Sequence, residues 1–465
     1  MTGIAFCALS QNRSVRRPHS PLFNASLIRR RFYETINIAL LGFGTVGSGV
    51  AETIKRNSQM MAEQLGCQLK ITYVLVRHPD KYKNVPLLEG VHLTSSFEEI
   101  MADPDIGIVV EVMGGIHPAK EYIFEALNHK MSVVSANKDV VALFGPEIMH
   151  TAMENHVNFS CEASVGGGIP ILRPLHDSLA ANEIESIVGI VNGTTNFILS
   201  SMDEEGVSYS DALRVAQKKG FAEADPTNDV CGYDAARKLA ILASIGFRAN
   251  VTFDDVLVEG IEKISQKDVQ YASEMGYAIK LLAVGTRQDN GIALNVYPAF
   301  VPRTHPLASV KGSYNAIYVT GNIVDDVMFY GRGAGSLPTA SAVMADVIST
   351  AKHIMNGSTG TGMMLTETKR IPFYSSLKLK NSYYFRLIVD DVTGVLSQIA
   401  SAYADHDISI KEVVQKSRFE DAAELMIITQ DTPRENIIHV EKALQVLPCM
   451  RQVANIVRVM NDDRE

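Results

Sequence analysis

Short hydrophobic runs alternate with amphipathic segments between residues 36 and 135. Brief apolar runs bounded by turn residues are typical of buried strands, and longer periodic segments between them are typical of helices. The predicted strands are Ile36–Leu41, Leu69–Val76, Ile106–Glu111 and Met131–Ser135, with helices at Ser48–Arg56 and Lys120–Asn128. This alternation predicts a doubly wound parallel sheet of the Rossmann type in an α/β fold.

A glycine-rich turn connects the first predicted strand to the first helix. Its residues are Gly42, Phe43, Gly44, Thr45, Val46 and Gly47, in the pattern G-x-G-x-x-G. Glycines at these places permit a tight turn and let the backbone approach a pyrophosphate at the helix N-terminus. The pattern alone would also suit a plain glycine-rich turn, but its position between strand and helix favours dinucleotide binding.

Three residues follow the carboxyl ends of predicted strands, where ligands bind in such sheets. Arg77 follows the second strand, where an acidic residue would accept a bond from a free ribose 2′-hydroxyl. An arginine there suits a 2′-phosphate, so NADP is favoured over NAD; the alternative is a solvated strand end. Gly114 and Lys138 follow the third and fourth strands and are candidates for contact with cofactor or substrate.

Residues 221–238 combine several carboxylates and a lysine with the breakers Pro226 and Gly232. Asp234 and Lys238 stand at i and i+4 on one face of a predicted helix, and Glu223 and Asp229 lie in the preceding loop. Such a group could hold a cationic amine while the lysine acts on a neighbouring oxygen. The alternative is an ordinary helix N-terminus with acids favoured by the helix dipole.

The last 80 or so residues form a separate pattern after the glycine-rich segment 356–362, which has linker composition. The order of elements is β-α-β-β-α-β, which predicts a ferredoxin-like unit. The strands are Tyr383–Val389, Ile408–Gln415, Ala423–Thr429 and Val453–Val459, and the helices are Val395–Ala404 and Arg434–Leu447.

Composition restricts the classes of function and location. The chain has 465 residues, enough for two or three domains, and no apolar run long enough for a membrane span. Residues 1–33 hold six arginines and no Asp, Glu or Lys; removing these charges from the formal −9 leaves −15, which disfavours nucleic-acid binding. We expect this tail to be a disordered extension of a cytoplasmic protein, with an organelle transit peptide as the alternative.

The five cysteines are scattered without a CxxC motif or metal-ligand spacing, which argues against a disulfide framework and a structural zinc site. This usage favours a reducing compartment. Cys161 and Cys231 border the polar segments described here. We predict that both are small buried residues, because a nucleophilic thiolate would need a base partner.

Several motifs occur in the order of the homoserine dehydrogenase family, which residues 36–350 resemble. They are Ser135-Ala-Asn-Lys138, Glu162-Ala-Ser-Val165, Val191-Asn-Gly-Thr-Thr195, Glu223-Ala-Asp-Pro226, Gly232-Tyr-Asp-Ala-Ala-Arg-Lys238 and Gly331-Arg-Gly-Ala-Gly-Ser-Leu-Pro-Thr-Ala340. The resemblance implies NAD(P)-dependent interconversion of L-aspartate 4-semialdehyde and L-homoserine, on the route to threonine, isoleucine and methionine. It also implies a homodimer or homotetramer.

The resemblance assigns roles to particular residues. Lys238 matches the proton-transfer lysine and Lys138 the lysine beside cofactor and substrate. Glu223, Asp229 and Asp234 match the substrate-binding acids, with Glu223 holding the ammonium group. The remaining matches are a monovalent cation site, usually sodium, at Glu162 and the carbonyls of Val165, Gly167 and Ile169, and a cofactor contact at Gly335, after which the helix Ala340–Thr350 should pack on the nucleotide domain.

The C-terminal unit resembles an ACT domain, a module that senses amino acids, with Thr393-Gly394-Val395 at its first strand-helix turn. This predicts feedback inhibition by L-threonine; the alternative is a domain that only oligomerises. The expected divisions are a tail (1–34), a nucleotide-binding domain (35–160, completed by a helix at about 335–352), a catalytic and dimerisation domain (161–334), a linker (353–379) and the ACT domain (380–465).

Two other functions remain open. Another NAD(P)-dependent amino-acid or semialdehyde dehydrogenase would explain the first domain but not the ordered motifs of the second. A catalytically silent amino-acid sensor would explain only the C-terminal unit. A fusion to aspartate kinase is not expected, because no segment of kinase size precedes residue 36.

Overall fold

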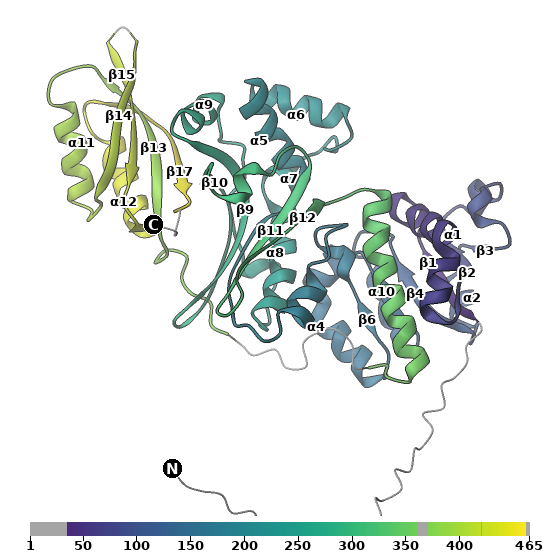
Figure 1. Ribbon diagram of the computed structural model, residues 1–465. Helices are drawn as coiled ribbons and strands as arrows, with labels where there is room; N and C mark the ends of the chain where they lie inside the picture. The colour runs from purple at the N-terminus through teal and green to yellow at the C-terminus, as the bar shows by residue number, and fades with distance from the viewer. Residues whose placement is uncertain (1–34, 361–370, 420, 462–465) are drawn as a thin grey trace, which may run out of the picture.

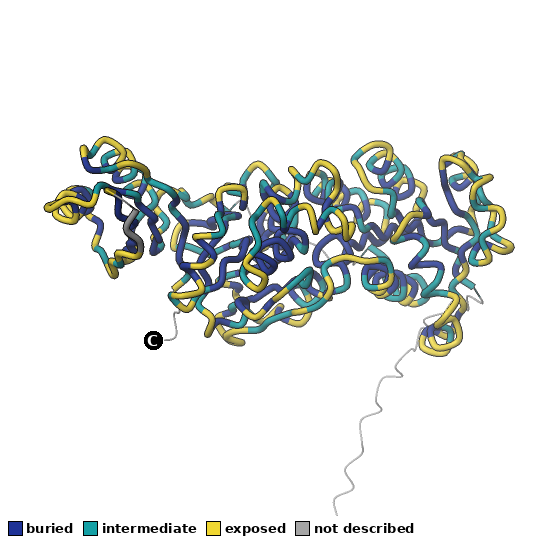
Figure 2. Tube along the Cα trace, turned by 90° about the horizontal axis from the view of Figure 1, so that it is seen from above, coloured by how far each residue is buried: buried dark blue, intermediate teal, exposed yellow. Residues whose placement is uncertain are grey.

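The computed structural model describes residues 35–360, 371–419 and 421–461, which fold around two sheets (Figure 1). Buried residues run through the interior along the whole length of the molecule, and exposed residues gather at helix surfaces and loop tips (Figure 2). The predicted arginine-rich tail and part of the predicted linker lie outside the described residues. No helix in the described ranges is both long and apolar enough to cross a membrane.

The first sheet is parallel throughout and has the strand order β3-β2-β1-β4-β5-β6. Its strands are β1 (Thr35–Leu41), β2 (Gln68–Leu75), β3 (His92–Thr94), β4 (Ile106–Glu111), β5 (Ser132–Ser135) and β6 (Phe159–Ser160). This is the strand order of a dinucleotide-binding Rossmann sheet, and ligands bind at the carboxyl edge where the order reverses. The predicted parallel α/β sheet is therefore confirmed.

Helices cover both faces of this sheet because alternate side chains of each strand point to opposite sides. The helices are α1 (Thr45–Leu65), α2 (Phe97–Met101), α3 (Ala119–Asn128), α4 (Lys138–Glu154) and α10 (Ser336–Asn356). Ile38 packs with Val50 of α1 and Val343 of α10, whereas Ala39 packs on the side of α3 and α4. Helix α10 thus returns from the second half of the chain to the nucleotide-binding sheet, as expected for this segment.

Two predicted boundaries on this side of the molecule were wrong. Helix α1 begins at Thr45 and continues to Leu65, beyond the predicted end at Arg56, because Met61 and Leu65 are buried in its later turns. Helix α10 ends at Asn356, so the linker does not begin at residue 353. Gly357 then adopts a left-handed conformation with φ 65° and closes the helix.

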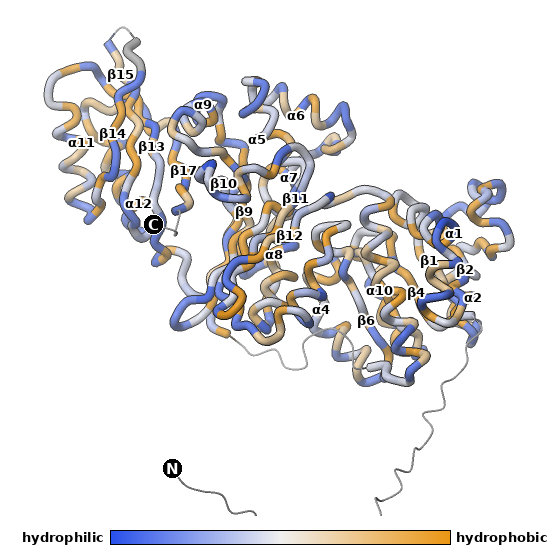
Figure 3. Tube along the Cα trace, viewed as in Figure 1, coloured by the Kyte–Doolittle hydropathy of each residue, from blue (hydrophilic) through white to orange (hydrophobic). Residues whose placement is uncertain are grey.

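The second sheet has eleven strands, and its main path is β12-β11-β7-β9-β10-β17-β13-β15-β14. The strands are β7 (Ile184–Ile190), β8 (Leu257–Val258), β9 (Tyr277–Gln288), β10 (Gly291–Pro302), β11 (Tyr314–Gly321), β12 (Asp325–Arg332), β13 (Lys380–Asp390), β14 (Ile410–Phe419), β15 (Ala422–Thr429), β16 (Thr432–Pro433) and β17 (Met450–Val459). Hydrophobic residues follow both β15 and, in the middle of the molecule, helix α8 (Figure 3). In the central strand β9, Leu281 and Ala283 belong to one apolar cluster and Ala278 and Leu282 to another. The central strands are therefore packed on both faces.

Five helices surround the first part of the second sheet. They are α5 (Gly193–Glu205), α6 (Tyr209–Lys218), α7 (Thr227–Val230), α8 (Tyr233–Gly246) and α9 (Gln266–Glu274). Helix α8 packs against β7, β9 and β10, and it also contacts α4, one of the helices that cover the first sheet. This placement brings the polar segment 221–238 between the two sheets.

The C-terminal strands have the order β17-β13-β15-β14, and α11 (Val395–Ala404) and α12 (Arg434–Gln445) pack on one face. These elements follow the predicted β-α-β-β-α-β order. The structure corrects the expectation of a separate unit beyond a linker, because β17 pairs with β10 at Ala299↔Arg458 and Phe300↔Val459. Tyr384 also stacks on Phe300 with ring centroids 4.5 Å apart. One sheet therefore extends from the catalytic body into the C-terminal region.

Candidate active site

A carboxylate at the start of α8 joins two lysines from different parts of the chain. Gly232, with φ 86°, turns the chain into α8, and Asp234 follows in the first turn. Lys238, one turn later, donates to Asp234 Oδ2 at 2.7 Å and to the Val191 carbonyl at 2.8 Å. Lys138, the first residue of α4, places its Nζ 2.5 Å from Asp234 Oδ1. The structure thus brings together three of the predicted site residues.

Asn192 connects this cluster to a fourth predicted residue, Asp229. The Asn192 amide donates to Asp229 Oδ1 at 2.7 Å and to Asp234 Oδ2 at 2.9 Å. The Asn192 side-chain oxygen accepts from the Thr195 amide at 2.8 Å and caps helix α5. One side chain therefore fixes both the helix start and the two carboxylates.

Burial and charge oppose each other at the carboxylates. Burial alone would raise the pKa of Asp234, but the positive charges of Lys238 and Lys138 outweigh it and hold this pKa well below its usual value. Burial also lowers the pKa of Lys138, yet the charge and hydrogen bond of Asp234 leave it raised overall. At Asp229 burial dominates and raises the pKa. Asp234 is therefore ionised and Lys138 beside it protonated at neutral pH.

The cluster forms one wall of a large cleft between the two sheets. Thr45 and Gly335 line the side toward the first sheet, and Glu223 lines the side toward α6. Glu223 is exposed on this wall, whereas Asp234 of the cluster is buried. Gly335, with φ 123°, begins α10 and stands on the same cleft. A ligand in the cleft can therefore contact the nucleotide turn and the lysine cluster together.

The glycines of the nucleotide turn have unequal surroundings. A Cβ at Gly47 would collide with the Gly42 carbonyl, and one at Gly42 would stand 3.1 Å from the Val112 carbonyl, with φ 102° at Gly42. A Cβ at Gly44 would stand in open space, with no atom of the described residues within 4 Å. The turn is therefore tight beneath Gly42 and Gly47 and open at Gly44, which fits the close approach of a pyrophosphate.

Glu111, for which the sequence motifs predicted no role, holds the other loops at the carboxyl edge of the first sheet. Its Oε1 accepts from the Met113 amide at 2.8 Å, and its Oε2 accepts from the Ser135 hydroxyl at 2.6 Å. Asn137 donates to the Gly115 carbonyl at 2.7 Å and caps α4. Burial raises the pKa of Glu111. The feature of the sequence that could have predicted this network is a carboxylate at the end of an otherwise apolar strand.

The remaining predicted cofactor residues lie at the same edge. Arg77 is exposed just beyond β2, and Gly114, with φ 77°, lies in the loop after β4. Phe43 is buried and meets the ring of Tyr82 edge-on at 5.5 Å. The side chain of Phe43 therefore supports the turn from within the protein.

The Glu162 carboxylate accepts hydrogen bonds from three backbone amides. Its Oε1 accepts from the amides of Ile171 and Leu172 at 2.6 and 2.8 Å, and its Oε2 accepts from the amide of Arg173 at 2.8 Å. The predicted partner residues Val165, Gly167 and Ile169 occupy the adjoining turn. Within the described residues, no three or more His, Cys, Asp or Glu side chains are grouped to hold a metal ion.

The two cysteines beside these segments differ from each other. Cys161 is buried, as predicted, and burial raises its pKa. Cys231 is only partly buried, which corrects the prediction, because it ends the short helix α7 and its Sγ donates to Glu262 Oε2 at 3.1 Å. Burial and this hydrogen bond raise the pKa of Cys231 to about 11, so the thiol is protonated at neutral pH.

A dinucleotide turn that faces a lysine-carboxylate cluster across one cleft defines an NAD(P)-dependent oxidoreductase. Comparison with known proteins agrees with this class. Residues 42–162 match the model of the homoserine dehydrogenase NAD-binding domain, and residues 170–348 match the homoserine dehydrogenase model. The chain belongs to the homoserine dehydrogenase family.

Individual relatives support this assignment. A homoserine dehydrogenase of Bacillus subtilis is 39% identical over 92% of this chain and 98% of its own length. The structure of a homoserine dehydrogenase from Thiobacillus denitrificans superposes with a TM-score of 0.87 at 37% identity, covering 92% of this chain and 98% of the other. An archaeal homoserine dehydrogenase in complex with NADPH has a TM-score of 0.58 at 28% identity, covering 68% and 97%. The chain is thus an oxidoreductase that acts on a CH-OH group with a nicotinamide cofactor.

Proposed function

We propose that this enzyme reduces L-aspartate 4-semialdehyde to L-homoserine with Lys238 as the proton donor. The observation that supports the proposal most strongly is the Lys138–Asp234–Lys238 cluster on the cleft shared with Thr45 and Gly335. When bound, a reduced nicotinamide supplies the hydride. The remaining chemistry is proton transfer and orientation, for which the cluster has suitable groups.

Lys238 is suited to hold the aldehyde oxygen. A lysine ammonium has three N–H donors, and two of them are used by Val191 and Asp234. The third can donate to the aldehyde oxygen and then transfer a proton as the alkoxide forms. Asp234 keeps both ammonium groups oriented, and Lys138 lies between the nucleotide edge and the substrate.

The acids of the segment 221–238 suit the rest of the substrate. L-Aspartate 4-semialdehyde has an ammonium group, and carboxylates near the cleft can pair with it. We assign this contact to Glu223, which is exposed on the cleft wall, with Asp229 and Asp234 as supporting acids. The test of the whole proposal is oxidation of NADPH and of NADH by the full chain with this aldehyde, with and without L-threonine.

We propose NADP as the preferred cofactor, with Arg77 at the 2′-phosphate. Arg77→Ala is expected to raise KM for NADPH about tenfold and to leave KM for NADH unchanged, because only NADPH loses a charge-assisted hydrogen bond. Initial rates with each cofactor measure this. Lys81→Ala, an exposed cation a few residues further on, is the matched control. Equal changes for both cofactors would contradict the role of Arg77.

We also propose a monovalent cation at the turn of Val165, Gly167 and Ile169, and the family resemblance points to sodium. Carbonyl oxygens suit a hard cation. Because the Glu162 carboxylate already accepts three backbone N–H groups, its contribution would be to shape this turn and to supply negative charge. We therefore include Glu162 in the proposed cation site.

We propose that the C-terminal region is an ACT domain that binds L-threonine near Thr393, Gly394 and Val395. Gly394 has φ 89°, and Val392 and Leu396 beside it are exposed. Exposed apolar side chains of this kind are typical of a surface that pairs with another subunit. The domain divisions given above, with the linker moved to begin after Asn356 and the C-terminal strands joined to the second sheet, complete the proposal together with a cytoplasmic location and a homodimer or homotetramer.

Gly394→Ala tests the sensing role. A side chain at this positive φ costs about 1–2 kcal/mol, so half-inhibition should need about 5- to 30-fold more L-threonine. Inhibition curves of the purified chain measure the shift. Gly90→Ala places a methyl group at a similar φ of 76° in the nucleotide-binding region and should leave the curve unchanged. A wild-type enzyme that is insensitive to threonine would favour the role in oligomerisation alone.

A further inference from the structure

Residues 259–263 lie between the C-terminal strands and the substrate-binding turn; we call them the connecting segment. The segment continues β8 beside β10, and the Glu259 amide donates to the Val296 carbonyl at 2.8 Å. The substrate-binding turn is residues 229–234, between Asp229 and Asp234. The connecting segment therefore has the C-terminal strands on one side and the substrate-binding turn on the other.

Strand β17 holds the connecting segment from the C-terminal side. Arg458 Nη1 lies 2.9 Å from Glu259 Oε2, and the Arg458 guanidinium also covers the ring of Tyr297 at 4.1 Å. The Asn455 amide donates to the Lys263 carbonyl at 3.1 Å. Both ends of the segment are thus joined to the same C-terminal strand.

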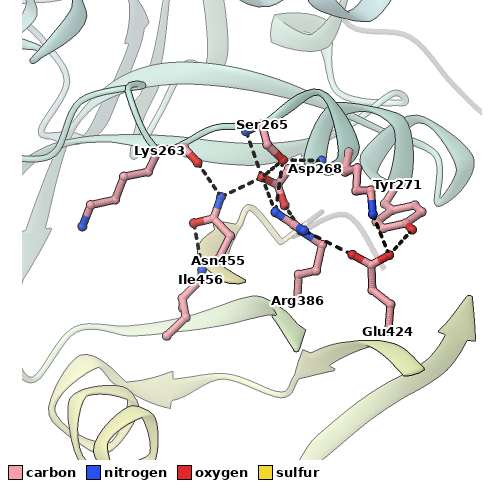
Figure 4. A network of polar contacts seen from close by, with 9 residues as sticks. Lys263, Ser265, Asp268, Tyr271, Arg386, Glu424, Asn455 and Ile456 are labelled. Carbon is pink, nitrogen blue, oxygen red and sulfur yellow. Dashed lines mark hydrogen bonds and ion pairs between the residues drawn. The ribbon is translucent and has the colours of Figure 1, made fainter. Parts of the chain in front are cut away.

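A buried polar network extends this attachment into α9 (Figure 4). Arg386 Nε donates to Asp268 Oδ1 at 2.7 Å, and its Nη1 donates to Glu424 Oε1 at 3.1 Å. Asn455 donates to Asp268 Oδ2 at 2.9 Å, and Tyr271 donates to Glu424 Oε2 at 2.7 Å. Since Asp268 is also the capping-box acid of α9, the end of the connecting segment cannot shift without disturbing these bonds.

The other side of the connecting segment supports the substrate-binding turn. The Ile261 amide donates to the Val230 carbonyl at 2.8 Å. Gly260 packs so closely that a Cβ there would collide with the Val230 carbonyl and the Cys231 Cα. A Cβ at Gly232 would likewise stand 3.1 Å from Val258. The turn between the two substrate acids therefore rests on the connecting segment.

We propose that Glu259, Gly260 and Arg458 are positioning residues through which the C-terminal strands set the place of the substrate acids. This inference rests on the proposed function, because Asp229 and Asp234 must hold the substrate. Substrate binding, and not cofactor binding, then depends on the contact between β17 and the connecting segment. The nucleotide turn, at Gly42–Gly47, belongs to the other sheet.

The test compares full-length variants in NADPH oxidation with L-aspartate 4-semialdehyde. Glu259→Gln, Arg458→Met and Gly260→Ala are each expected to raise KM for the aldehyde by about 2- to 30-fold, the range for residues that act through packed neighbours. KM for NADPH should stay within about twofold. The double variant of Glu259→Gln and Arg458→Met should match the larger single effect, because both remove one contact.

Arg451→Met is the matched control, because Arg451 lies on the same strand and pairs with Asp390 at the exposed surface. It should change neither KM. If Arg458→Met does not fold, Glu259→Gln tests the inference in its place. The Glu259 side chain is 37% exposed, so this substitution should be tolerated by the fold. Folded Glu259→Gln and Gly260→Ala variants with an unchanged aldehyde KM, or with only a lowered Tm, would overturn the inference. A wild-type chain that does not oxidise NADPH with the aldehyde would overturn the proposed function as well.

Discussion

Lys238→Ala is expected to lower kcat by about 10²- to 10⁴-fold, the usual scale for losing a positioned proton donor. The Lys238 Nζ is 2.7 Å from Asp234 and 2.8 Å from the Val191 carbonyl, and alanine cannot reach the aldehyde oxygen. Affinity for NADPH should stay nearly intact, because the nucleotide turn is on the first sheet. Steady-state rates and NADPH titration by fluorescence measure the two quantities.

Lys311→Ala is the control for this variant, because Lys311 is an exposed lysine paired with Glu204 at 2.7 Å. It should retain wild-type kcat. Lys238→Arg keeps the charge but widens the donor group, so it should recover binding of the aldehyde more than turnover. Near-normal turnover of Lys238→Ala would show that another group donates the proton.

Asp234→Asn should have the second large effect, because it removes the charge that bridges both lysines. Breaking a buried ion pair on one side typically costs about 3 kcal/mol or more in the free energy of unfolding. We also expect kcat/KM to fall by at least about 100-fold, since neither lysine keeps its orientation. Urea unfolding and aldehyde reduction measure these losses.

The stability difference should depend on pH in a defined direction. The pKa of Asp234 is held below its value in the unfolded chain, so its contribution is complete above about pH 4 and is lost as the pH falls further. The difference between wild type and Asp234→Asn should therefore shrink in acid. Asp211→Asn, which breaks an exposed pair with Arg214, should change stability far less than Asp234→Asn at any pH. An Asp234→Asn chain as stable as wild type would contradict the structural role of the cluster.

Local patterns predicted several elements well. Helix α11 has the predicted bounds, Val395–Ala404, because Gly394 adopts a positive φ directly before it and the apolar positions recur with helical spacing. The strand-turn-helix at Gly42–Gly47 was also predictable, since the glycine spacing itself reports the tight turn. In both cases the contacts that determine the local structure join residues that are close together in the sequence.

Other features depended on contacts between distant residues. The predicted i,i+4 pair of Asp234 and Lys238 is present, but the third member of the cluster, Lys138, reaches Asp234 from the start of α4, beside the other sheet. Asn192 lay within a recognised motif, yet its bridge to two carboxylates appears only when α5 and α8 meet. The hydrogen bond of Cys231 has the same origin, because its acceptor, Glu262, lies in the connecting segment.

By itself the sequence determined the Rossmann-type half, the family to which the enzyme belongs and the residue types of the cleft, because these depend on periodicity and on short motifs. Only the tertiary structure decided that β17 pairs with β10 and makes the C-terminal region part of the second sheet. Strand pairing of this kind uses backbone N–H and C=O groups that every residue except proline has, so side-chain patterns do not specify the partner. The tertiary fold likewise decided which acid meets which lysine, because that choice follows from the packing of helices onto two separate sheets.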